Sequence, residues 1–180
     1  MAQEPWARIS RVAEGIWSVV SHPMTDRTTL CNGGIVAGRS GVVIVEAFGS
    51  EAGARWVADR ATELTGRTPT HVVITHYHGD HTAGLAGSLA AGEPEVIVTT
   101  TTRDLVVERN GEASAAALAD ARTLDARRPT EIDLGDRSVI LVPRRGHTPS
   151  DVTVEIPEDG VVFCGDLVWN EMFPDRKRVV

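Results

Sequence analysis

The chain has 180 residues and is 42% hydrophobic, which is enough to bury the core of one ordinary domain, expected to cover residues 1–180. Its formal net charge of -7 argues against a nucleic-acid-binding surface, which is normally basic. No apolar run approaches the ~20 residues of a membrane-spanning helix, and the first residues lack the basic-then-apolar pattern of a secretory signal, so we expect a cytoplasmic protein that binds no membrane.

In the first part of the chain, four short runs rich in β-branched residues predict strands that pair as two hairpins. These runs cover residues 8–12, 15–21, 30–37 and 41–45, with a polar loop at 22–28 between the hairpins. Ser50 can then cap a helix whose apolar residues share one face. Gly66 is expected to end this helix.

The rest of the chain alternates strands with helices before it returns to hairpins. The predicted order is a strand at 71–75, a helix at 82–90, a strand at 95–98, helices at 102–109 and 112–124, and strands at 131–134, 137–142, 151–156 and 161–164. Because strands come in runs with helices between them, the sequence predicts an α/β (α+β) fold in which sheets pack between helices. The two cysteines, Cys31 and Cys164, lie far apart in apolar segments and are expected to be free thiols.

Three of the six histidines lie within the stretch His76–His81, directly after a predicted strand. In an extended segment, side chains two residues apart point the same way, so His76 and His78 can bind one metal ion. Asp80 and His81 project differently and can reach a second ion or hold the attacking water. Imidazole and carboxylate ligands suit Zn²⁺, and also iron or manganese. The stretch therefore predicts a metal site at the carboxyl end of a strand, where open sheets place active sites.

Two later residues extend this predicted site. His147 lies in a Gly-His-Thr-Pro loop, and Asp166 follows the strand at 161–164 through Gly165. On its own, each is typical of an ordinary surface loop or turn. Beside the first cluster, we predict that both are metal ligands.

Taken in order, these motifs resemble those of the metallo-β-lactamase superfamily. The family's His-x-His-x-Asp-His motif is matched by His76–His81, and its Gly-His-Thr loop is matched at His147. Its Phe-x-Gly-Asp strand end is matched by Phe163–Asp166, and Asn32-Gly33-Gly34 resembles an early strand of the family. The resemblance covers roughly residues 8 to 170.

The resemblance implies a metallo-β-lactamase-type αβ/βα sandwich with a dinuclear zinc centre. His76, His78 and His147 would bind the first metal, Asp80 and His81 the second, and Asp166 would bridge them. The implied activity is hydrolysis of a small ester, thioester, lactone or amide through a metal-bound hydroxide. Asp80 would be the catalytic residue that orients the hydroxide and takes up a proton.

The sequence departs from the family pattern in two places. Zinc β-lactamases of the best-known kind usually carry Cys where this chain has Asp166, and an Asp there resembles the glyoxalase II and general hydrolase branches. Family members also usually continue to a strand that brings a further His to the second metal, whereas no histidine follows His147. We therefore expect a C-terminally incomplete domain that lacks a last strand and its helices.

Two alternatives follow from these departures. His76, His147 and Asp166 form a two-His-one-carboxylate set of the kind that binds one non-haem iron, as in the family's persulfide dioxygenases. The chain could instead be an inactive metal-binding fragment that a homo-oligomer or a complementing chain completes. The expected partners are a small-molecule substrate and, in this last alternative, a second copy or a complementing chain, with no nucleic acid and no membrane. Glu46, Tyr77 and Thr148 are expected to support the metal loops by contact or hydrogen bond.

Overall fold

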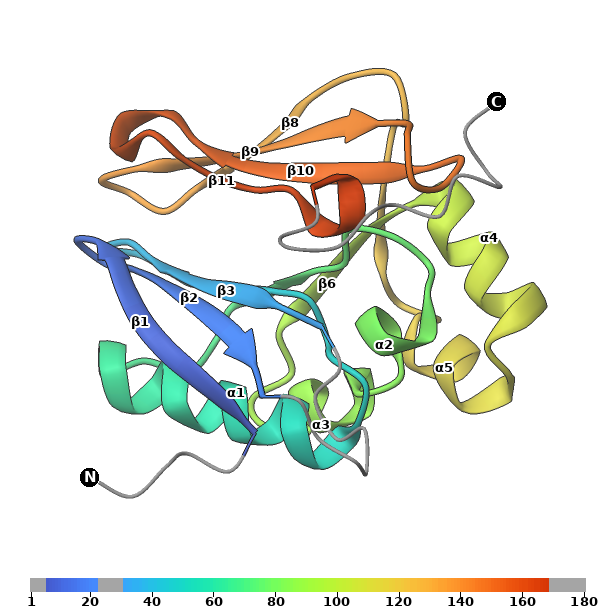
Figure 1. Cartoon of the computed structure of the whole chain (residues 1–180), viewed down its shortest axis with the longest axis horizontal. Coiled ribbons are helices and arrows are strands. Elements are labelled where there is room, and N and C mark those ends of the chain that lie inside the picture. The colour runs from blue at the N-terminus through green and yellow to red at the C-terminus, as the bar shows by residue number, and fades with distance from the viewer. Residues whose placement is uncertain (1–5, 23–30, 169–180) are drawn as a thin grey trace.

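The computed structural model describes residues 6–22 and 31–168, and most of the predicted loop at 22–28 lies outside these ranges. Two β-sheets face each other, and the α-helices cover the far side of the first sheet (Figure 1). The first sheet has the strand order β1-β2-β3-β4-β5-β6-β7, and the second has the order β11-β10-β9-β8. The α/β fold with packed sheets is therefore confirmed.

The first sheet begins antiparallel and becomes parallel after β4. Its strands are β1 (Ala7–Ala13), β2 (Ile16–Ser21), β3 (Gly33–Ala37), β4 (Val42–Val45), β5 (His71–Val73), β6 (Glu95–Thr99) and β7 (Arg122–Leu124). The second sheet is antiparallel throughout. Its strands are β8 (Thr130–Asp133), β9 (Ser138–Arg144), β10 (Asp151–Ile156) and β11 (Val161–Phe163). All the predicted hairpins are present.

The helices of the described chain are α1 (Glu51–Thr65), α2 (Gly79–Thr82), α3 (Leu85–Leu89), α4 (Thr100–Arg109) and α5 (Glu112–Ala117). The side chain of Ser50 caps α1 by accepting a hydrogen bond from the Gly53 N–H at 3.2 Å. Gly66 ends it in the left-handed conformation, with φ of 72°. Both ends of α1 are as predicted. None of the described helices is long and apolar enough to cross a membrane.

Two helix predictions were wrong, for reasons of packing. The helix expected at 82–90 is split into α2 and α3 at Gly84, whose N–H donates to the Phe48 carbonyl at 2.9 Å. The backbone there is so close that a Cβ at Gly84 would lie 2.2 Å from the Ala47 carbonyl oxygen. The helix expected at 112–124 stops at Ala117, and the remainder forms β7, which pairs with β6. Pairing with the sheet edge outweighs the local helix preference of an alanine-rich run.

The first sheet separates two hydrophobic cores. One core lies between this sheet and the helices, and the other fills the space between the two sheets. Strand β4 shows the arrangement, since Val42 and Ile44 belong to the helix-side core while Val43 and Val45 belong to the core between the sheets. Alternate residues of a strand point to opposite faces, so an all-apolar strand must be buried on both sides. The candidate metal ligands lie beyond the carboxyl ends of these central strands, at the edge where the two sheets meet.

Candidate metal centre

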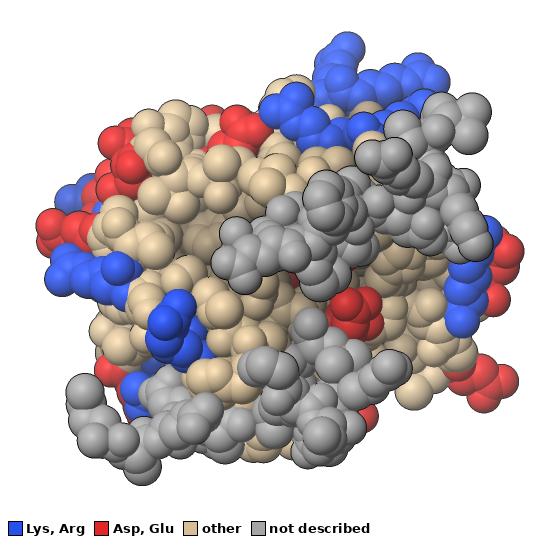
Figure 2. Space-filling model, in the orientation of Figure 1, with Lys and Arg blue, Asp and Glu red and all other residues tan. Residues whose placement is uncertain are grey.

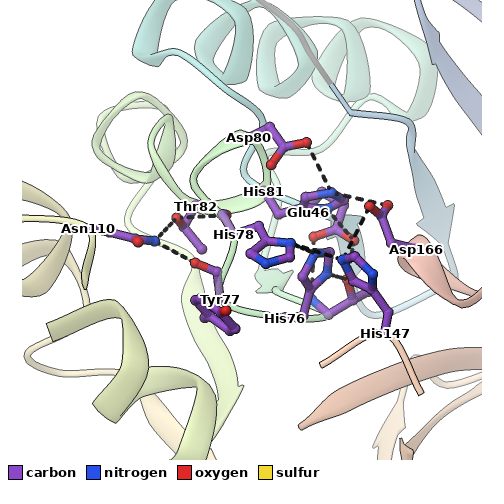
Figure 3. A network of polar contacts seen from close by, with 11 residues as sticks. Glu46, His76, Tyr77, His78, Asp80, His81, Thr82, Asn110, His147 and Asp166 are labelled. Carbon is purple, nitrogen blue, oxygen red and sulfur yellow. Dashed lines mark hydrogen bonds and ion pairs between the residues drawn. The ribbon is translucent and has the colours of Figure 1, made fainter. Parts of the chain in front are cut away.

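The first histidine cluster lies just beyond the carboxyl end of β5. After Thr75 the chain leaves the sheet, and the rings of His76 and His78 come together with 3.1 Å between Nε2 and Nδ1. Helix α2 begins directly afterwards, so Asp80 and His81 stand on its first turn. The rings of His76 and His78 thus face each other, and the ring of His81 lies beside that of His76, with 4.1 Å between their centroids (Figure 3).

His147 reaches this cluster from the second sheet, on the loop between β9 and β10. Its Nε2 atom lies 2.9 Å from Nδ1 of His78. Among the described residues, His76, His78, His147 and Asp166 each offer one ligand atom, and these four atoms lie within 4.8 Å of one another. Segments far apart in the sequence thus form one group that could hold a metal ion.

Asp166 stands between this group and the remaining two predicted residues. Its Oδ2 atom is 3.5 Å from Nε2 of His147, and its Oδ1 atom is 3.3 Å from Nε2 of His81. The same His81 nitrogen is 3.5 Å from Oδ2 of Asp80. All six predicted residues therefore lie together, in two halves that share the carboxylate of Asp166.

Glu46, which follows β4, contacts residues next to both halves of the candidate metal centre. Its carboxylate accepts a hydrogen bond from Thr75 Oγ1 at 2.6 Å and lies 3.2 Å from Nδ1 of His81. The Thr75 hydroxyl also lies 3.0 Å from Nδ1 of His76. The backbone of Glu46 has a φ of 80°, a conformation that side chains other than Gly rarely adopt. The predicted contact of Glu46 with the metal loop is confirmed.

Sequence reasoning missed two residues that hold the ligand loops in place. Asn110 donates from Nδ2 to the Tyr77 carbonyl oxygen and, at 3.0 Å, to Thr82 Oγ1. From the sequence alone, Asn110 is recognisable only as part of the break between two predicted helices. Nothing local in the sequence links Asn110 to the metal loop.

Asp151, the other residue missed, shapes the His147 loop. It is buried, and its carboxylate accepts hydrogen bonds from the N–H groups of His147 and Thr148 and from the Thr148 hydroxyl. The role predicted for Thr148 is thus confirmed. The sequence offered one signal for this role: Asp151 is a short acidic residue three positions after Thr148. Asp side chains at this spacing often accept hydrogen bonds from loop N–H groups.

The site's electrostatics keep one ring neutral and place another among carboxylates. Burial, aided by His81, lowers the pKa of His76 to about 2, so its ring is neutral and has a nitrogen lone pair to offer. Burial opposes charge on His81 as well, but the carboxylate of Glu46, with help from Asp166, raises the pKa of His81 well above its usual value. His81 thus lies in an environment that favours positive charge.

The residues present fit a bound metal cation. Two ligand atoms on one tetrahedral zinc ion, bound at about 2.0–2.1 Å, lie about 3.3 Å apart. The histidine nitrogens are already 2.9 and 3.1 Å apart, so little movement would be needed. Both ring nitrogens of His81 are buried without a hydrogen bond of good geometry, although three carboxylates lie within 3.5 Å. Imidazole nitrogen and carboxylate oxygen are both donor types that bind metal cations.

A cavity of about 750 Å³ opens beside the Asp80, His81 and Asp166 half. Its remaining lining is largely apolar, and includes Val20, Val161 and Phe163. Cys31 and Cys164 also line it, and both are free thiols as expected. Burial raises the pKa of the Cys31 thiol to about 11, so it is not ionised at neutral pH.

Replacing Glu46 with alanine is expected to weaken metal binding by about 10- to 100-fold, the range seen when a residue that orients a ligand is lost. Without the Glu46 carboxylate, the Thr75 hydroxyl and the His81 ring each lose the contact that orients them. Titration of the metal-free protein with zinc against a competing chelator measures the effect. Glu46→Gln keeps an acceptor for Thr75 and should recover part of the affinity. Equal affinity in wild type and Glu46→Ala would show that the contact is only structural.

Comparison with known proteins agrees with the geometry. A family model described as the metallo-beta-lactamase superfamily matches residues 27–178. A metallo-beta-lactamase from Pontibacter korlensis superimposes with a TM-score of 0.70 at 17% identity, covering 84% of this chain and 67% of that one. At this identity the likeness shows the fold alone.

Curated relatives are similar over part of their length. A hydroxyacylglutathione hydrolase from Erythrobacter litoralis is 28% identical over 110 residues, covering 61% of this chain and 38% of the relative. The alpha subunit of a 2,4-dinitroanisole O-demethylase from a Nocardioides species is 24% identical over 183 residues, covering 91% of this chain and 54% of the relative. The chain thus spans roughly two fifths to one half of the length of these relatives.

Proposed function

This chain belongs to the metallo-beta-lactamase superfamily, and on that premise we propose that it is a dinuclear zinc hydrolase of a small ester, thioester, lactone or amide. One observation carries the proposal. Ligand atoms of His76, His78, His147 and Asp166 lie within 4.8 Å of one another. Similarity to a protein named hydroxyacylglutathione hydrolase supports the thioester among these substrates.

The position of Asp166 supports a centre with two metal ions. One of its oxygens faces His147 at 3.5 Å and the other faces His81 at 3.3 Å. A carboxylate with an oxygen toward each half suits a bridging ligand, with Asp80 and His81 completing the second half. We therefore propose two ions, with Zn²⁺ as the metal because the ligands are imidazole and carboxylate.

Metal bound in such a site lowers the pKa of a water molecule to about 7 and polarises the substrate oxygen. The side chains of the chain supply the remaining roles. Asp80 is 36% exposed and borders the large cavity, so its carboxylate can orient the attacking water and accept its proton. Glu46 and Thr75 fix the rings of His81 and His76. The apolar wall of the cavity can hold the substrate's apolar part.

Metal analysis of protein purified with zinc present, followed by a thioesterase assay, tests this function. We expect about two zinc ions per chain and activity that a chelator abolishes and added zinc restores. Protein that binds no metal under these conditions would contradict the proposal. Bound iron with oxygen uptake on glutathione persulfide would favour the mononuclear dioxygenase, whose three ligands all belong to the four-residue group.

Solution size, measured on the same preparation, tests the remaining alternative. A zinc-loaded monomer that turns over substrate contradicts an inactive fragment that needs a partner. A zinc-loaded protein without turnover, which gains activity on forming an oligomer or complex, would support completion by another chain.

A further inference from the structure

A second cavity of about 460 Å³ adjoins the metal cluster at His147. It is lined by Tyr77, Arg109 and the loop from Arg145 to Pro149. The large cavity touches the cluster through His81 and Asp166 instead. Because the two cavities have different ligand residues in their walls, a substrate at the metal centre can extend into either.

The charge of this second cavity is opposite to that of the first. Its lining has two arginines and no acidic residue, whereas Glu46, Asp80 and Asp166 all border the large cavity. The chain as a whole carries a net charge of -7. Figure 2 shows arginine side chains gathered at the end of the second sheet that faces α4. The two arginines therefore make this cavity locally positive, next to the metal group, in a chain that is acidic overall.

The two arginines are presented differently. Arg109, at the end of α4, donates from Nη1 to the Tyr77 hydroxyl at 3.1 Å and lies 5.3 Å above the centre of that ring. Tyr77 is buried and orients one side of the guanidinium, while Glu108 Oε1 lies 3.6 Å from Nε of Arg109 on the exposed surface. Arg145 is exposed, and its guanidinium has no hydrogen-bond or ion-pair partner among the described residues. The Arg109 guanidinium is thus oriented before a ligand binds, and the Arg145 guanidinium is accessible to a ligand from solvent.

We propose that this cavity binds an oxyanion group of the substrate, a carboxylate or a phosphate, through Arg109 and Arg145. Guanidinium groups match both oxyanions with paired N–H donors, and an oriented guanidinium loses less entropy on binding. The inference rests on the proposed hydrolase function and narrows its substrates to acyl compounds that carry an anionic group near the bond that is cleaved.

Three matched thioesters test the site: one with a terminal carboxylate, its neutral methyl ester, and a phosphonate of the same length. In Arg109→Gln and Arg145→Gln we expect KM for the two anionic thioesters to rise about 10-fold, the loss of one charge-assisted hydrogen bond. The kcat values and the KM of the neutral ester should not change. Arg103→Gln is the control, because Arg103 lies on the same helix outside the cavity and bonds to Asp104. If only one anionic thioester responds, the site is assigned to that oxyanion.

Binding of an uncleavable thioether that carries the same carboxylate, measured by calorimetry on zinc-loaded protein, separates this proposal from the proposed function. Arginine-dependent binding without hydrolysis of any thioester would retain the oxyanion site and reject the thioester as the hydrolase's substrate. A wild type with no preference for the anionic compounds, or a double variant that keeps the preference, overturns the site. Thermal unfolding of each variant confirms that it is folded.

Discussion

Replacing His76 with alanine is expected to lower metal affinity and hydrolysis by more than about 100-fold, beyond the range for residues that only orient a ligand. His76 is 1% exposed, and its Nε2 atom lies 3.1 Å from Nδ1 of His78, so its removal takes a ligand atom from the centre of the cluster. Its ring is kept neutral by burial, which leaves the nitrogen ready to bind a cation. Zinc content after dialysis, and thioesterase activity at saturating zinc, measure the two effects.

His71→Ala is the matched control for that experiment. His71 begins β5, the strand that precedes His76, and is partly buried, but its ring contacts Thr70 and Glu95 outside the metal group. We expect wild-type zinc content and activity in this variant. If His76→Ala and His71→Ala bind zinc equally well, the assignment of the cluster as the metal site is wrong.

Replacing Asp166 with asparagine is expected to reduce zinc from about two ions to one or fewer, and activity by more than about 100-fold. The amide keeps the size of the side chain but removes the negative charge that faces both His147 and His81. The histidine trio can still bind one ion, because its nitrogens already lie 2.9 and 3.1 Å apart along the series His147, His78 and His76. Zinc per chain, measured by mass spectrometry of the native protein, distinguishes loss of one ion from loss of both.

Asp120→Asn controls for the change of charge, since Asp120 is exposed and lies outside both cavities. This variant should keep both ions and full activity. Two tightly bound zinc ions in Asp166→Asn would refute the bridging role, and a single ion in the wild type would favour the mononuclear alternative. A folded but metal-free variant would instead show that Asp166 is needed by the first site as well.

The pattern of residues along the chain was enough to identify the six candidate ligands and most of the secondary structure. The stretch His76–His81 combines ligand spacing with a strand before it, and both features are local. Helix α1 was predicted to the residue at its ends because Ser50 and Gly66 act through contacts within one helical turn. Local signals of this kind do not depend on how the sheets pack.

The tertiary structure alone decided which distant side chains meet. Glu46 reaches His81 because β4 pairs with β5, and Asn110 reaches the Tyr77 carbonyl because α4 packs against β6, next to β5 in the sheet. The segment that forms β7 was expected to be helical, because its pairing with β6 is a long-range contact that a local pattern does not show. The approach of Arg145 to Arg109 likewise depends on the second sheet packing over the first. Such contacts join residues far apart in the sequence, and burial between the layers, not local preference, determines them.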